Sequence, residues 1–344
     1  MNKHLYPYKW FLKDGYPKSN GLNVFGTFIC GGGSTMGYKL AGFNHLGGVE
    51  IDPKISDVYK TNHNPKYLYN EDIREFNKRE DLPNELYKLD ILDGSPPCST
   101  FSMAGAREKG WGKKKQFREG QTIQTLDDLV FVYCDTIIKL KPKVFILENV
   151  KGIIQGNAKV YSKNIVLKMQ KAGYVVQVFM LNAASMGVPQ KRERVFFIGH
   201  KKELNYPKLK LQFDEKPIIF SEISEISEIS EIKVKESILF KQWSKRKSSD
   251  KNFGDICLRT EGKYKSFGRV LIHDKDVFPT IVSGNEYLHF LQFKFVNKNE
   301  YCKVGTYPID YNFKSIEPKY LIGMSVPPIM TAQIANQILI QWFN

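Results

Sequence analysis

The chain has 344 residues, of which 42% are hydrophobic and 25% charged, which predicts a globular protein with a large core and about two domains. Its net charge of +15 is unusual for a metabolic enzyme and indicates a nucleic-acid partner. The sequence has no apolar signal core, membrane-length apolar run or lipidation signal, so we expect a cytoplasmic protein without a membrane partner. Its five scattered cysteines predict a reduced protein without disulfides or a structural metal.

The first part of the chain alternates between strand-like and helix-like stretches. Strands are predicted over residues 23–29, 46–51, 89–92, 144–147, 175–181 and 194–198. Helices are predicted over residues 38–41, 55–62, 126–140 and 165–172. This alternation predicts an α/β fold with a doubly wound parallel sheet.

The sequence changes character after about residue 200, and it is lysine-rich and less periodic to about residue 318. We predict a second domain here. It contains four tandem Ser-Glu-Ile triplets over residues 221–232, which we interpret as a short helix or loop lengthened by repeat expansion, a surface insertion without chemistry. Residues 329–343 return to a helical apolar pattern after two prolines, which are tolerated at a helix start.

A glycine run, Gly31 to Gly33, follows the first predicted strand, and Glu50 lies at the end of the second. Glycines let the backbone approach a ligand, and a carboxylate at the next strand end can accept hydrogen bonds from ribose hydroxyls. A plain tight turn would also explain the glycines. The run lacks the Gly-x-Gly-x-x-Gly spacing of pyrophosphate sites, which leaves room for a nucleoside cofactor without phosphate.

Pro96, Pro97 and Cys98 follow another predicted strand, at the sheet edge where α/β proteins place their chemistry. The prolines make the loop rigid, and the nearby lysines favour a nucleophilic thiolate. An isolated cysteine is more often a buried structural residue. Glu148 ends a further apolar strand, where burial favours a protonated acid over an exposed carboxylate.

Taken in order, these stretches resemble the C5-cytosine DNA methyltransferases of restriction–modification type. The matching motifs are Phe28-Ile29-Cys30-Gly31-Gly32-Gly33, Glu50, Asp72-Ile73, Pro96-Pro97-Cys98, Asp128-Leu129, Glu148-Asn149-Val150, Gln190-Lys191-Arg192-Glu193-Arg194, Phe278-Pro279-Thr280-Ile281 and Gly323-Met324-Ser325-Val326-Pro327-Pro328. Any one tripeptide is common by chance, whereas this order is highly specific. Two residues depart from the family pattern: Cys30 replaces the usual first glycine, and Met324 replaces an asparagine.

The resemblance implies a doubly wound mixed sheet of the Rossmann-like methyltransferase kind. The catalytic domain would cover residues 1–200, completed by 319–344, and residues 201–318 would form the target-recognition domain. The implied reaction moves a methyl group from S-adenosyl-L-methionine to C5 of a cytosine flipped out of duplex DNA, leaves S-adenosyl-L-homocysteine and needs no metal. We expect a monomer, associated with the nucleoid, that protects host DNA against a separate restriction endonuclease.

The resemblance also implies roles for individual residues. Cys98 would add to C6 of the base and Glu148 would protonate N3, while Arg192 and Arg194 would anchor the base, a flanking phosphate or Glu148 itself. The expected cofactor-binding residues are Phe28, Gly31, Gly33, Glu50, Ile51, Asp72, Ile73, Pro97, Leu129, Met324 and Ser325. The expected DNA-binding residues are Ser99, Ser102, Lys113, Lys114, Arg118, Gln190, Lys245 and Arg246. Residues 102–121 are rich in glycine and lysine and are expected to close over the DNA, and the weaker candidates for reading bases are Gln242, Arg259 and Arg269.

Two other functions fit parts of the sequence. A tRNA cytosine-C5 methyltransferase would use the same chemistry, but the long segment between the arginine motif and Pro279 is expected for duplex recognition. A catalytically inactive DNA-binding regulator would retain the charge, but it would not need Cys98, Glu148, Arg192 and Arg194 together.

Overall fold

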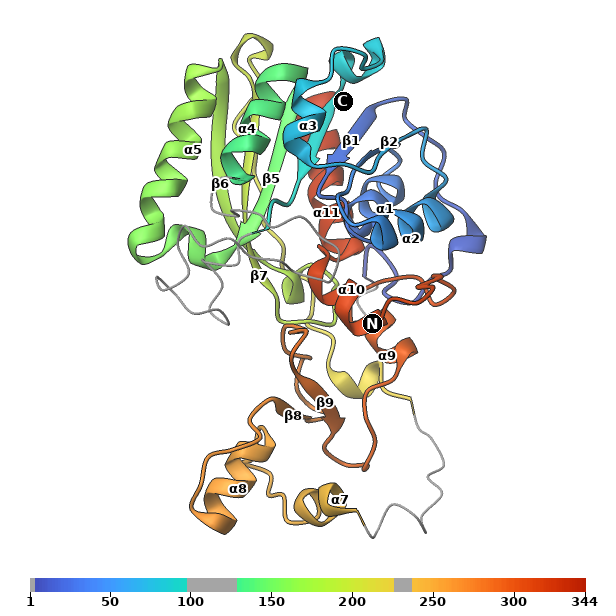
Figure 1. Cartoon of the computed structure of the whole chain (residues 1–344), viewed down its shortest axis with the longest axis vertical. Coiled ribbons are helices and arrows are strands. Elements are labelled where there is room, and N and C mark those ends of the chain that lie inside the picture. Colours follow the sequence, from blue (N-terminus) through green and yellow to red (C-terminus); the bar gives the residue numbers. More distant parts are fainter. Residues whose placement is uncertain (1–3, 98–128, 226–236) are drawn as a thin grey trace.

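The computed structural model describes residues 4–97, 129–225 and 237–344 (Figure 1). A seven-stranded sheet with the order β3-β2-β1-β4-β5-β7-β6 forms the upper part of the molecule. Its strands are β1 (Asn23–Thr27), β2 (Asn44–Val49), β3 (Tyr67–Tyr69), β4 (Ile91–Gly94), β5 (Val144–Val150), β6 (Tyr174–Asn182) and β7 (Glu193–Lys201). The strand order reverses between β1 and β4, so the loops after these two strands meet where doubly wound sheets bind ligands.

Strand β7 runs antiparallel to both of its neighbours, β5 and β6. The doubly wound mixed sheet is therefore confirmed, and the all-parallel sheet predicted from strand–helix alternation alone is wrong at β7. The physical reason is the length of the connection from β6 to β7, which covers only residues 183–192. A parallel pair needs a crossover of about a dozen residues or more, usually with a helix.

Helices cover both faces of the sheet. One face packs against α3 (Ile73–Lys78), α4 (Leu129–Leu140) and α5 (Lys159–Lys171), and the other against α1 (Gly33–Leu40) and α11 (Pro328–Ile338), with α2 (Pro53–His63) beside α1. Successive residues of β5 alternate between these two cores: Phe145 and Leu147 lie in the first, Val144 and Ile146 in the second. Within the described ranges, no helix has the length and apolar character to cross a bilayer.

A smaller part of the molecule lies at the other end (Figure 1). It contains α7 (Ile238–Trp243), α8 (Phe253–Glu261) and a parallel pair of strands, β8 (Arg269–Ile272) and β9 (Glu286–His289). These elements have a core of their own around Trp243, Phe253 and Leu288. The domain boundaries at residues 201 and 318 stay a prediction.

Between the two parts, α9 (Lys298–Val304) and α10 (Pro318–Met324) share a core with α2 and residues 218–223. Ile223 belongs to the first Ser-Glu-Ile triplet and is fully buried in this core. The triplet is therefore a packing element, unlike the surface insertion that its repetition suggests. Most of the remaining triplets lie outside the described residues.

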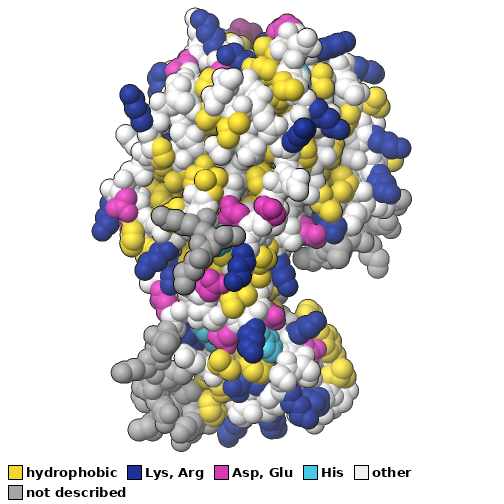
Figure 2. All heavy atoms as spheres, turned by 180° about the vertical axis from the view of Figure 1, so that it is seen from behind, with side chains coloured by type: hydrophobic (Ala, Val, Ile, Leu, Met, Phe, Trp, Pro, Cys, Tyr) yellow, Lys and Arg dark blue, Asp and Glu magenta, His cyan; other side chains and the backbone are white. Residues whose placement is uncertain are grey.

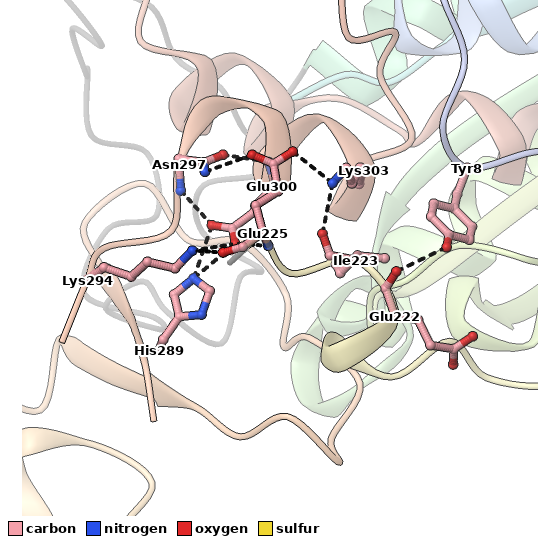
Figure 3. Close-up of polar contacts among 9 residues, drawn as sticks. All are labelled: Tyr8, Glu222, Ile223, Glu225, His289, Lys294, Asn297, Glu300 and Lys303. Carbon is pink, nitrogen blue, oxygen red and sulfur yellow. Dashed lines mark hydrogen bonds and ion pairs between the residues drawn. The ribbon is translucent and has the colours of Figure 1, made fainter. Parts of the chain in front are cut away.

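A buried polar cluster joins β9, α9 and the chain at Glu225 (Figure 3). Glu300 is fully buried, and its carboxyl lies 3.1 Å from His289 Nε2 and 3.3 Å from Lys294 Nζ. It also accepts hydrogen bonds from the backbone N–H groups of Glu225 and Asn297. Burial opposes the charge, but the bonds from His289, Glu225 and Asn297 outweigh it and lower the pKa of Glu300.

We expect Glu300→Gln to lower the free energy of unfolding by about 3 kcal/mol, because Lys294 loses its buried counter-charge. The folded pKa of Glu300 is below its usual value, so the stabilisation is present above that usual value and is lost as pH falls through the folded pKa. Urea denaturation at several pH values measures both effects. Glu75→Gln, in an exposed pair with Lys78, is the control and should change stability by less than about 0.5 kcal/mol. Equal effects of the two substitutions would contradict this account.

Candidate active site

A cavity of about 340 Å³ lies at the carboxyl edge of the sheet, beside the point where the strand order reverses. The end of β5 and the loops after β1, β2, β3 and β4 form one side of its wall, and α10 with the residues after it forms another. The expected site residues that line it are Phe28, Gly33, Glu50, Ile51, Asp72, Ile73, Pro97, Leu129, Glu148, Arg192, Arg194, Met324 and Ser325. Two other expected residues, Gly31 and Gln190, are not in its lining.

The glycine run forms a tight loop at one end of the cavity. The predicted strand over residues 23–29 ends at Thr27, because Phe28 and Cys30 have positive φ angles of 54° and 48°. Gly32 is also left-handed, with φ 75°, and α1 begins directly afterwards at Gly33, five residues before the predicted helix. The run therefore turns the chain from a strand into the N-terminus of a helix.

Gly31 and Gly32 are held against other segments of the chain. The Gly31 carbonyl accepts a 2.6 Å hydrogen bond from the Tyr311 hydroxyl and lies 3.2 Å from His63 Nε2. A Cβ atom on Gly32 would lie 2.2 Å from the same His63 atom. Gly31 thus anchors the loop to Tyr311 and His63, while Gly33 lines the cavity.

We expect Gly33→Ala to destabilise the protein by about 2 kcal/mol, because its Cβ would lie 2.1 Å from the backbone oxygen of Val326. Gly284→Ala is the matched control: its Cβ would meet no atom within 4 Å, so the free energy of unfolding should change by less than about 0.5 kcal/mol. Urea denaturation compares the two. Equal stabilities would show that the loop tolerates a side chain.

Glu50 connects the loop after β1 to the end of β2. Its Oε2 atom accepts a hydrogen bond from the Cys30 N–H, and its Oε1 atom accepts one from the Asp52 N–H, both at 2.9 Å. Burial raises the pKa of Glu50 to about 7, although both backbone bonds favour the charged form. Each carboxylate oxygen has a second lone pair, so Glu50 can also accept from a ligand hydroxyl.

Glu148 and Arg194 form an ion pair in the cavity wall. Arg194 Nε lies 2.9 Å from Glu148 Oε1; Glu148 is buried, and the Arg194 side chain is 14% exposed. Arg194 pairs in the sheet with Val150, two residues beyond Glu148, so Arg194 and Glu148 lie on the same face and diagonally opposite. Burial lowers the pKa of Arg194, and the charge of Glu148 opposes this effect.

Arg192 makes a different contact, although it is only two residues away. Its Nη1 atom donates to the carbonyl of Gly323 in α10 at 3.0 Å. It is 2% exposed, and among the described residues its Nε has no hydrogen-bond partner. Burial and the charge of Arg194 lower the pKa of Arg192 to about 9. Arg192 therefore offers an unused donor beside the cavity.

Cys98 lies outside the described residues, as do Ser99, Ser102, Lys113, Lys114, Arg118 and Asp128. The described loop before it is well placed: Pro96 and Pro97 line the cavity, and the Asn149 side-chain amide donates to the Pro96 carbonyl at 3.3 Å. The described loop therefore ends at Pro97 in the wall of the cavity that Glu148 also lines.

The described cysteines differ in their surroundings. Cys134, Cys257 and Cys302 are buried, and burial raises the pKa of the Cys134 and Cys302 thiols to about 12. Cys30 is partly exposed and lines the cavity. Within the described ranges, no group of His, Cys, Asp and Glu residues is arranged to hold a metal ion.

The expected DNA-binding residues that the structure describes are not brought together at the cavity. Gln190 is almost fully buried, and within the described ranges its side-chain oxygen has no hydrogen-bond partner. The Arg246 guanidinium lies 3.2 Å from the centre of the Trp243 ring, and Arg246 Nε donates to the Phe290 carbonyl. Arg246 therefore supports the small core, where two of its five N–H donors bond to backbone carbonyls. Lys245 lies in the same part of the molecule, away from the cavity.

Sequence reasoning missed Ile55, Glu71 and Tyr320, which also line the cavity. Glu71 directly precedes Asp72, an expected cofactor-binding residue, and this is the one local signal among the three. Tyr320 belongs to α10, which only the folded chain brings to the sheet edge.

Comparison with known proteins identifies the family of this chain. The sheet, with its single antiparallel strand β7, is of the methyltransferase type. The family of C-5 cytosine-specific DNA methylases matches residues 22–340. The chain belongs to this family, which confirms the family and the enzyme class predicted from the motifs.

Two curated relatives illustrate the match. The type II methyltransferase M.FnuDI of Fusobacterium nucleatum is 34% identical over 188 residues, which cover 54% of this chain and 48% of that protein. This alignment thus spans about half of the relative. M1.HphI of Haemophilus parahaemolyticus is 27% identical over 363 residues, which cover 97% of this chain and 91% of the relative.

Solved structures share the fold at low sequence identity. A DNA modification methyltransferase from an E. coli prophage has a TM-score of 0.64 and 19% identity, covering 94% of this chain and 100% of the other. DNMT2 of Spodoptera frugiperda has a TM-score of 0.63 and 15% identity, with the same coverage. Both confirm the predicted fold class.

Proposed function

We propose that this chain transfers a methyl group from S-adenosyl-L-methionine to C5 of a cytosine flipped out of duplex DNA. One observation supports this proposal above the others: a single cavity is lined by the glycine loop and Glu50 and also by Pro97, Glu148 and Arg194. A nucleoside cofactor and an extruded base would therefore meet in one cavity. Its relatives are type II methyltransferases, so we further propose that it protects host DNA in a restriction–modification system.

One group of residues in the cavity lining fits S-adenosyl-L-methionine. Glu50 would accept hydrogen bonds from the ribose hydroxyls, and Phe28, Ile51 and Ile73 would contact the adenine ring. Asp72 and Ser325 offer further polar groups in the cavity lining. The bound cofactor supplies an electrophilic methyl group on a sulfonium.

A second group of residues fits a cytosine. The Cys98 thiolate would add to C6, forming a carbon–sulfur bond, and Glu148 would give a proton to N3, so that C5 gains electron density. After C5 has taken the methyl group, loss of the C5 proton and of the thiolate, with return of the N3 proton to Glu148, restores the aromatic ring. Arg194 would orient Glu148, and the free donor of Arg192 would bind the base.

Duplex DNA would be held by positive charge outside the cavity. The net charge of +15 favours phosphate contacts, which position a protein on DNA without reading its sequence. The lysines of residues 102–121 and Lys245 remain proposed contacts. The target sequence would be read by the part that contains α7, α8, β8 and β9.

The test is expression of this chain in a bacterium that lacks cytosine methylation, followed by bisulfite sequencing of its DNA. We expect C5 methylation at one short sequence throughout the genome. The purified protein with radiolabelled S-adenosyl-L-methionine should label unmethylated duplex DNA and leave tRNA unlabelled. Labelling of tRNA alone would favour the RNA enzyme, and no labelling of either would favour an inactive regulator.

A further inference from the structure

The loop between α8 and β8, residues 262–268, carries two exposed aromatic side chains. Tyr264 is 54% exposed and Phe267 is 65% exposed. Their rings are stacked, with centroids 6.0 Å apart and planes 2° from parallel. Exposed apolar groups of this size gathered on a loop mark an interaction surface. We call this segment the aromatic loop.

Backbone geometry holds the aromatic loop in shape. Gly262 caps α8 in the left-handed conformation with φ 69°, and Ser266 has φ 62° between the two aromatic residues. The Tyr264 hydroxyl also lies 3.4 Å from the side-chain amide of Asn252 at the other end of α8. The rings are therefore positioned before any partner binds, which lowers the entropy cost of binding.

The surroundings of the aromatic loop are positively charged. Lys265 Nζ lies 2.6 Å from Glu261, and this bond, with the charges of Lys245 and Lys263, lowers the pKa of the Glu261 carboxyl. Three lysines thus act on one carboxylate, which leaves an excess of positive charge. Figure 2 shows Lys and Arg side chains next to hydrophobic ones on the smaller part of the molecule. Such a mixture of ring faces and cations suits a nucleic acid.

Contacts connect the aromatic loop to the rim of the cavity. The carbonyl of Gly268 accepts a 2.8 Å hydrogen bond from the Glu286 N–H at the start of β9. Asn285, which precedes Glu286, accepts through its carbonyl a 2.8 Å hydrogen bond from Lys319 Nζ of α10. Met324, at the end of α10, lines the cavity. These contacts link the aromatic loop, through β9, to a helix that lines the cavity.

We propose that the aromatic loop is a contact surface for the duplex DNA substrate, with Tyr264 and Phe267 against bases and sugars in a groove and Lys263 at an adjacent phosphate. This inference rests on the proposed function. It adds specific base-side contacts to a small domain whose lysines alone would only position the DNA.

The test measures KM and kcat for unmethylated genomic duplex DNA, using radiolabelled S-adenosyl-L-methionine, for the whole chain and its variants. In Tyr264→Ala/Phe267→Ala, loss of two ring contacts should raise the KM for DNA roughly 10- to 100-fold and leave the KM for the cofactor unchanged. Tyr264→Phe keeps the ring and should behave like the wild type. Tyr87→Ala removes a 40% exposed aromatic side chain from the other part of the molecule and should have no effect.

Salt dependence separates the two kinds of contact. Lys263→Gln should reduce the slope of log affinity against log salt by about 0.9, because one phosphate contact is lost, whereas the aromatic variant should keep the wild-type slope. An unchanged KM for DNA in the aromatic double variant would overturn the inference while the wild type still methylates DNA. A wild-type protein that methylates no duplex DNA would overturn the proposed function, and the inference with it.

Discussion

Replacement of Cys98 by alanine is expected to reduce methyl transfer by a factor on the order of 10⁴ or more, because the alanine side chain cannot form the bond to C6 that makes C5 nucleophilic. DNA binding should change little, since the thiol contributes no charge pairing to phosphates. Radiolabelled methyl incorporation measures the first effect, and a gel-shift titration with duplex DNA measures the second.

The decisive control uses DNA that carries 5-fluorocytosine at the target site, which traps the covalent adduct because fluorine cannot leave as the C5 proton does. The wild type and Cys30→Ala should form the adduct, and Cys98→Ala should not. Cys30 is the appropriate comparison because, of the described cysteines, it lines the cavity, while Cys134, Cys257 and Cys302 are buried. An adduct mapped to Cys30 by mass spectrometry would refute the nucleophile assignment.

Replacement of Glu148 by glutamine should reduce kcat about 10²- to 10⁴-fold, because an amide has the shape of the acid but cannot deliver a proton to N3. The effect should lie mainly in kcat, because the proton is needed as charge develops on the ring and not when the base binds. Single-turnover methyl transfer at saturating DNA measures this step directly.

Glu193→Gln is the matched control for this substitution. Glu193 precedes Arg194 on β7, but its side chain is 44% exposed and pairs with Lys151 at 3.0 Å. Its replacement should leave kcat unchanged. Similar losses in both variants would indicate a general effect of charge at this strand and would remove Glu148 from its proposed role.

Local sequence was sufficient to find most of the residues that line the cavity. Apolar runs marked the strands, and the residues directly after them, such as Glu50, Pro97 and Glu148, lie at the carboxyl edge as expected. This works because parallel strands bring their carboxyl ends to one edge, so position along each strand fixes position in space. The exact ends of elements were less accurate: the first strand stops at Thr27 because the next residues need positive φ angles.

The sequence by itself determined the family, the chemical groups of the site and the side of the sheet on which they lie. Only the tertiary structure decided how those groups pair. In the folded chain β7 is antiparallel to β5, and Arg194 forms an ion pair with Glu148. Arg192 donates to the Gly323 carbonyl, and Arg246 donates to the Phe290 carbonyl in the smaller part of the molecule. The physical reason is that hydrophobic periodicity fixes which face of an element is buried, whereas the partner of a charged side chain depends on distances between segments far apart in the chain.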